Sequence, residues 1–180
     1  MCASTLILGG AKSGKTALAL DLAHKATGAD RLVYIATAQA HDDEMRQRIR
    51  HHQGERGPRW STLEEPLDLT GALAQADGPR AVLLVDCLTL WLSNLMTQAG
   101  LEAGAVRARG QELCLALPGL KARVILVANE VGLGIVPDNA LARAFRDCAG
   151  QLNQALAKVC HNVILVAAGL PLALKGALPY

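Results

Sequence analysis

Residues 9–16 of the chain read Gly-Gly-Ala-Lys-Ser-Gly-Lys-Thr, which fits the pattern GxxxxGK[ST]. An apolar run at Ser4–Leu8 precedes this motif, and Thr16–Lys25, with leucines spaced among alanines, predicts a helix after it. A strand, a glycine-rich loop and a helix in this order form a phosphate-binding loop, or P-loop. Its backbone N–H groups point inward at phosphate oxygens, and the helix N-terminus adds its positive end. The alternative is a glycine-rich turn with an incidental lysine, which the flanking elements disfavour.

The motif predicts roles for individual side chains. Lys15 is expected to reach the β- and γ-phosphates of a nucleotide, and the Thr16 hydroxyl to ligate Mg²⁺. Asp86 ends a run of five apolar residues and is the predicted second magnesium partner, although it could also cap the helix that follows. The predicted metal ligands are therefore Thr16 and Asp86. The loop residues predicted to bind the nucleotide are Gly9, Gly10, Ala11, Lys12, Ser13, Gly14, Lys15 and Thr16.

Strand and helix signals alternate along the chain, which is typical of an α/β fold with a mostly parallel sheet flanked by helices. Further strands are predicted at 32–36, 81–85, 123–128 and 162–167, and further helices at 42–52, 66–76, 88–98 and 102–115. Asp138 is the predicted N-cap of a long helix that runs to about residue 159, and the tail after Gly169 is expected to be irregular. We expect residues 1–180 to form a single P-loop nucleotide-binding domain.

Composition excludes several classes of protein. The chain of 180 residues is 51% hydrophobic, which excludes intrinsic disorder, and its net charge of +2 and 3% aromatic content argue against a nucleic-acid partner. Residues 163–174 form the longest charge-free apolar stretch, shorter than the roughly 20 residues that a membrane span needs. The five cysteines are widely spaced and form no CxxC pair. We expect a cytoplasmic protein with no membrane span.

Polar residues also follow the predicted strand at 123–128. Ligands of open α/β sheets bind at the carboxyl ends of the strands, so Asn129 and Glu130 are placed to line a site, although ordinary loop polarity explains them equally well. The glycine-rich apolar loop at 131–137 could form a lid or a subunit contact. The segment at 129–132 lacks the Lys and Asp of the guanine-reading NKxD sequence, which argues against a switch GTPase.

Segments spread over nearly the whole chain resemble one family. Two of them, Arg48–His52 (RIRHH) and Asn129–Pro137 (NEVGLGIVP), are much more specific than the P-loop. Together they resemble the bifunctional adenosylcobinamide kinase / adenosylcobinamide-phosphate guanylyltransferase family of cobalamin assembly. The other matching segments are 9–15 (GGAKSGK), 34–38 (YIATA), 42–45 (DDEM), 86–89 (DCLT) and 145–150 (FRDCAG).

The resemblance implies two activities. The first phosphorylates the aminopropanol hydroxyl of adenosylcobinamide from a nucleoside triphosphate, with ATP and GTP both open as donors. The second transfers GMP from GTP to adenosylcobinamide phosphate through a guanylylated histidine, and pyrophosphate leaves. The resemblance also implies a RecA-like P-loop sheet and a homotrimer.

The resemblance also assigns roles to residues by position. His51, the first histidine of the pair, would be the covalent nucleophile and Lys15 the second catalytic residue. Glu64 and Asp86 would lie close to the nucleotide, and Thr37 and His52 are weaker candidates for the same site. Two positions depart from the family pattern with their charge kept, namely Lys12, where Arg is frequent, and Asp86, where Glu can occur.

The residues around His51 agree with this role without requiring it. On a helix over 42–52, His51 shares a polar face with Arg48, whereas His52 lies on the apolar face with Ile49. A neutral imidazole near an arginine is a capable nucleophile toward an α-phosphate. Without the resemblance, a solvated surface histidine would be the favoured interpretation. Two alternative functions remain open, a single-step P-loop kinase of another small alcohol and a RecA-like regulatory ATPase.

Overall fold

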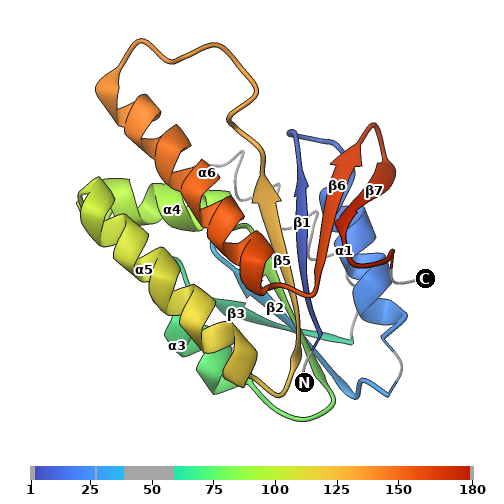
Figure 1. Ribbon diagram of the computed structural model, residues 1–180. Helices are drawn as coiled ribbons and strands as arrows, with labels where there is room; N and C mark the ends of the chain where they lie inside the picture. The colour runs from blue at the N-terminus through green and yellow to red at the C-terminus, as the bar shows by residue number, and fades with distance from the viewer. Residues whose placement is uncertain (1–2, 27, 39–58, 179–180) are drawn as a thin grey trace.

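The computed structural model describes residues 3–26, 28–38 and 59–178, and its described strands form one sheet. The sheet has seven strands in the order β3-β2-β4-β5-β1-β6-β7 (Figure 1). All neighbours pair in parallel except β7, which runs antiparallel to β6. The strands are β1 (Ser4–Gly9), β2 (Arg31–Ala36), β3 (Trp60–Glu64), β4 (Ala81–Asp86), β5 (Arg123–Asn129), β6 (Asn162–Ala167) and β7 (Leu170–Lys175).

Helices cover both faces of the sheet. Helix α1 (Lys15–His24) packs on one face, and a group of helices packs on the other (Figure 1). This group consists of α3 (Leu69–Ala76), α4 (Leu88–Thr97), α5 (Ala103–Ala116), which continues into the short 3-10 helix η1 (Leu117–Gly119), and α6 (Ala140–Val159). Within the described ranges, no helix is both long enough and apolar enough to cross a bilayer.

Strand residues alternate between two aliphatic cores. In β4, Leu83 and Val85 join the core beneath α3 to α6, whereas Val82 and Leu84 join the core beneath α1. All four side chains are fully buried. A strand buried on both faces needs a continuous apolar run, which is why residues 81–85 carry no polar side chain. The predicted α/β fold, a mostly parallel sheet flanked by helices, is confirmed, and most predicted elements lie within a few residues of the observed ones.

The N-cap prediction for the last helix was wrong. Asn139, not Asp138, caps α6, because its side-chain oxygen accepts a hydrogen bond from the Ala142 N–H at 2.7 Å. Either residue type can cap a helix, so the sequence alone does not choose between neighbours. The predicted helix at 42–52 lies outside the described residues.

The irregular tail was also a wrong prediction, because residues 170–175 form the edge strand β7. Ala168 and Gly169 both have positive φ, 51° and 79°, which suits a two-residue hairpin turn after β6. Pro171 fits because an edge strand tolerates a residue without an N–H. The amino group of Lys175 fastens the strand to the end of α6 by donating to the carbonyls of Ala157, Lys158 and Cys160 at 2.9, 2.9 and 2.7 Å.

We predict that Lys175→Met destabilises the fold by about 1 kcal/mol, because three carbonyls at the end of α6 lose their charged donor. Urea unfolding followed by circular dichroism measures the change. Lys121→Met, which removes an exposed lysine elsewhere, is the control. An equal loss of unfolding free energy in both variants would contradict this role of Lys175.

Candidate functional site

The P-loop joins β1 to α1 in a tight turn. Gly14 precedes the helix with φ 101°, and the Lys15 amino group folds back to donate to the Gly10 carbonyl at 2.6 Å. Gly9 has φ 153°, and a Cβ there would lie 2.3 Å from the Val166 carbonyl oxygen, so the backbone approach requires glycine. The loop lines an open hollow of about 470 Å³ together with Ala17 and Leu20 of α1.

The β6–β7 hairpin braces this loop from outside. The Gly169 N–H in the hairpin turn donates to the Ser13 carbonyl at 2.9 Å. A Cβ on Gly14 would lie 3.2 Å from the Gly169 Cα, so the turn and the loop are in close backbone contact. The turn that leads into the segment predicted as irregular is therefore in contact with the phosphate loop.

Thr16 and Asp86 meet at the loop, as the two-ligand prediction requires. The Thr16 hydroxyl donates to Asp86 Oδ2 at 3.1 Å, across the sheet from α1 to the end of β4. The cap alternative for Asp86 was wrong, because Cys87 is the N-cap of α4 and no side chain caps that helix.

The pair also fits Mg²⁺. Hydroxyl and carboxylate oxygens are the hard donors that this ion takes, and it completes its shell with waters and substrate phosphates. Among the described residues, no cluster holds three or more His, Cys, Asp or Glu side chains, so no all-protein metal cage competes with this arrangement there.

Lys15 is a buried charge beside Asp86. The residue is only 6% exposed, and burial lowers the pKa of its ammonium group, while Cys87 and Asp86 oppose that shift. Burial and the Asp86 charge raise the pKa of the Cys87 thiol to about 11, so the thiol is neutral at pH 7. Asp86 is thus the negative group that sustains the lysine charge until phosphate arrives.

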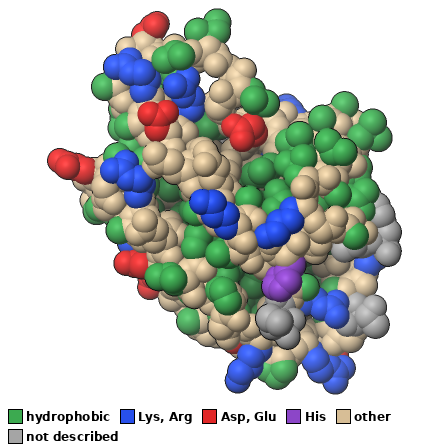
Figure 2. All heavy atoms as spheres, in the orientation of Figure 1, with side chains coloured by type: hydrophobic (Ala, Val, Ile, Leu, Met, Phe, Trp, Pro, Cys, Tyr) green, Lys and Arg blue, Asp and Glu red, His purple; other side chains and the backbone are tan. Residues whose placement is uncertain are grey.

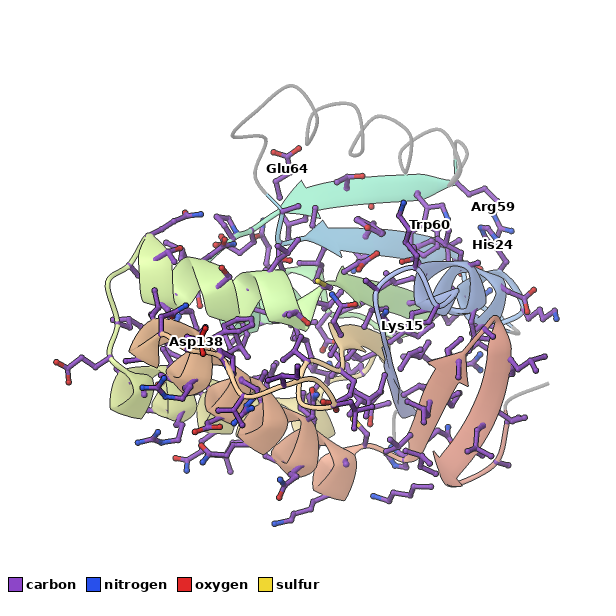
Figure 3. All side chains as sticks on the ribbon, turned by 90° about the horizontal axis from the view of Figure 1, so that it is seen from above. Lys15, His24, Arg59, Trp60, Glu64 and Asp138 are labelled. Atoms are coloured by element: carbon purple, nitrogen blue, oxygen red, sulfur yellow. The ribbon has the colours of Figure 1, made fainter. Side chains whose placement is uncertain are left out.

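Thr37 and Glu64 lie at the same edge of the sheet in different settings. The fully buried Thr37 hydroxyl donates to the Cys87 carbonyl at 2.8 Å and accepts from the Cys87 N–H at 2.9 Å, which ties the ends of β2 and β4 together. Glu64 is exposed at the end of β3, paired with Ala36, which in turn pairs with Asp86. In Figure 3 it stands apart from Lys15. The predicted nucleotide contacts of Thr37 and Glu64 stay predictions.

His51 and His52 lie outside the described residues, so their roles stay predictions too. Asn129 and Glu130, in contrast, adjoin the start of the P-loop. Asn129 pairs with Gly9, and the Glu130 N–H donates to the Gly9 carbonyl at 3.0 Å.

The loop that follows Glu130 is open to solvent. Leu133 is 88% exposed and Ile135 is 96% exposed. Arg143 donates to the carbonyls of Pro137 and Asp138 at 3.0 and 2.7 Å and so holds the loop onto α6. Figure 2 shows hydrophobic side chains at the upper end of the molecule and over the β6–β7 side.

We predict that Gly9→Ala weakens nucleotide binding by roughly tenfold or more, because the added Cβ collides with the Val166 carbonyl and the loop must shift. Gly10→Ala is the comparison, since nothing lies within 4 Å of its Cβ position, and we expect a smaller loss there. Titration with a fluorescent GTP analogue measures both. Equal losses in the two variants would contradict the close-approach argument.

Comparison with known proteins identifies the family. The family model described as "Cobinamide kinase / cobinamide phosphate guanyltransferase" matches residues 5–174. The chain belongs to this family. It is 49% identical over 171 residues to the bifunctional adenosylcobalamin biosynthesis protein CobP of Pseudomonas aeruginosa, covering 95% of this chain and 96% of that protein. It is 38% identical over 181 residues to the bifunctional protein CobU of Escherichia coli K12, covering 94% and 98%.

A solved structure from Pyrococcus horikoshii OT3 shares the fold, with a TM-score of 0.59 at 8% identity over 98% of this chain and 87% of that one. The enzyme class predicted from the sequence, a cobinamide kinase and cobinamide-phosphate guanylyltransferase of adenosylcobalamin biosynthesis, is confirmed at the level of the family.

Proposed function

We propose that the chain phosphorylates adenosylcobinamide with ATP or GTP, and then transfers GMP from GTP to the new phosphate through a guanylylated His51. The observation that supports the kinase step is the convergence of Lys15, Thr16 and Asp86 on the P-loop. The family match and the RIRHH segment support the guanylyl step.

In the kinase step, the loop holds the triphosphate by its backbone N–H groups and by Lys15. The lysine exchanges its hydrogen bond to the Gly10 carbonyl for bonds to the β- and γ-phosphates. Its ammonium group therefore reaches the phosphates without first losing a full hydration shell. The oxygen of the substrate hydroxyl attacks the γ-phosphorus and its proton passes to solvent, while the bond to the bridging oxygen breaks and the nucleoside diphosphate leaves. Mg²⁺, held by Thr16 and Asp86, would neutralise phosphate charge.

In the guanylyl step, an imidazole nitrogen of His51 attacks the α-phosphorus of GTP and pyrophosphate leaves. A phosphate oxygen of adenosylcobinamide phosphate then attacks the same phosphorus, which releases His51 and gives adenosyl-GDP-cobinamide. Arg48 or Arg50 would balance the developing negative charge.

The proposal includes further features that the sequence or the family resemblance suggests. Thr37, His52 and Glu64 would contact the nucleotide, the protein would act as a cytoplasmic homotrimer, and residues 1–180 would form one domain. The exposed leucines of β7, Leu170, Leu172 and Leu174, support a subunit contact because they leave apolar surface at a sheet edge.

For Lys15→Ala, we expect phosphoryl transfer to fall by about 10²–10³-fold, because the γ-phosphate loses its principal cation. Formation of phosphorylated cobinamide, followed by chromatography, measures the rate. Lys25→Ala is the matched control, since that exposed lysine lies just beyond the far end of α1, where it pairs with Asp21. Unchanged turnover of Lys15→Ala would exclude the P-loop as the kinase site.

A label-trapping experiment tests the covalent histidine. The protein is incubated with Mg²⁺ and GTP labelled in the α-phosphate, without corrinoid, and then denatured. We expect an acid-labile, base-stable adduct in the wild type and in His41→Ala, and none in His51→Ala. An adduct that survives in His51→Ala would exclude His51 as nucleophile. A wild type that binds GTP without forming any adduct would leave the single-step kinase or the ATPase.

A further inference from the structure

One carboxylate oxygen of Asp86 accepts hydrogen bonds from two hydroxyl groups. Oδ2 accepts from Thr16 at 3.1 Å and from Tyr34 at 3.0 Å. We propose that Tyr34 is a positioning residue of the nucleotide site, whose hydroxyl fixes the Asp86 carboxylate in the orientation that Mg²⁺ and the phosphates require. This inference rests on the proposed function, because it assigns Tyr34 a part in the same site.

The strand register brings the tyrosine to the carboxylate. Tyr34 pairs with Leu84, two residues before Asp86 on β4. Side chains two residues apart on a strand share a face, and Tyr34 and Leu84 both join the core beneath α1. The Tyr34 ring therefore lies on the face from which Thr16 of α1 also approaches, and its hydroxyl reaches two pairs further along the strands, to Asp86.

The tyrosine ring is itself held by neighbours. It is 6% exposed and meets Trp60 of β3 edge to face, with ring centres 6.3 Å apart. The Trp60 N–H donates to His24 Nε2 at 3.0 Å, and His24 is the last residue of α1 (Figure 3). The contacts thus run from one end of α1 through Trp60, Tyr34 and Asp86 to Thr16 at its other end.

These contacts restrict how the Asp86 carboxylate can turn. The terminal torsion of an aspartate is broad, so a carboxylate with one donor can turn. Two hydroxyls on Oδ2 restrict that rotation and leave Oδ1 for a metal ion or its water. Tyr34 touches Asp86 rather than the phosphates, so its effect on the nucleotide must pass through the carboxylate. Removal of the hydroxyl should therefore weaken metal-dependent binding more than binding of the free nucleotide.

Tyr34→Phe tests this directly, because it keeps the ring against Trp60 and removes only the hydroxyl. A fluorescent GTP analogue is titrated with Mg²⁺ at fixed nucleotide, and separately in EDTA, alongside thermal unfolding of the ligand-free protein. We expect the Mg²⁺ concentration for half-maximal binding to rise about tenfold, the usual scale for losing a charge-assisted hydrogen bond. Affinity in EDTA should stay at the wild-type value.

Ser61→Ala is the matched control. It removes a hydroxyl of β3 that donates to the Leu32 carbonyl of β2 and has no bond to Asp86 among those described. We therefore expect wild-type Mg²⁺ dependence. An unchanged Mg²⁺ requirement in Tyr34→Phe, or an equal loss with Mg²⁺ and with EDTA that follows the unfolding temperature, would overturn the positioning role. If the wild type itself binds GTP no more tightly with Mg²⁺ than with EDTA, the nucleotide-site proposal fails and this inference fails with it.

Discussion

The site depends on the parallel register of the central strands. Register pairs Gly9 with Asn129, Asp86 with Ala36, and Ala36 with Glu64, so the carboxyl ends of five strands form one continuous edge. Backbone hydrogen bonds determine these pairings, and the pairings determine where the side chains at the edge lie. Although β5 lies between β1 and β4, the Asp86 carboxylate meets the P-loop motif, because Thr16 at the start of α1 donates a hydrogen bond to it.

A second constraint is the close approach of backbone to backbone around the loop. Gly9 lies against the Val166 carbonyl and Gly14 lies against Gly169, so the loop is confined between the sheet and the β6–β7 hairpin. Confinement keeps the N–H groups aimed before any phosphate is present, which lowers the cost of ordering them during binding. The hairpin in turn depends on Lys175, which holds β7 to the end of α6. A residue far along the chain from the P-loop therefore contributes to its shape.

The parts of the fold that the sequence predicted are those where one local signal dominates. The buried strand at 81–85 and the P-loop were found because each has a pattern that few other structures share. Strand β3 was not predicted, since it has only five residues and most of them are polar. Strand β7 was missed because Pro171 and the neighbouring glycines are typical of loops. Both are edge strands, which depend on a neighbour rather than on their own apolar content. Tyr34 had no predicted role for a related reason, because its partner Asp86 is set by register and not by spacing.

The described histidines also bear on the guanylyl step. His161 bonds to Ser4 at the amino end of β1, opposite the end that carries the P-loop. His24 ends α1 and accepts from Trp60, and a helix of this length separates it from Lys15 by roughly 13 Å along the axis. Each of these rings is engaged at a place remote from the phosphate loop. Neither ring is placed to act on a nucleotide held by the P-loop. The family resemblance assigns the role of nucleophile to His51 of the RIRHH motif, which lies on the polar face of its predicted helix, and this assignment stays a prediction.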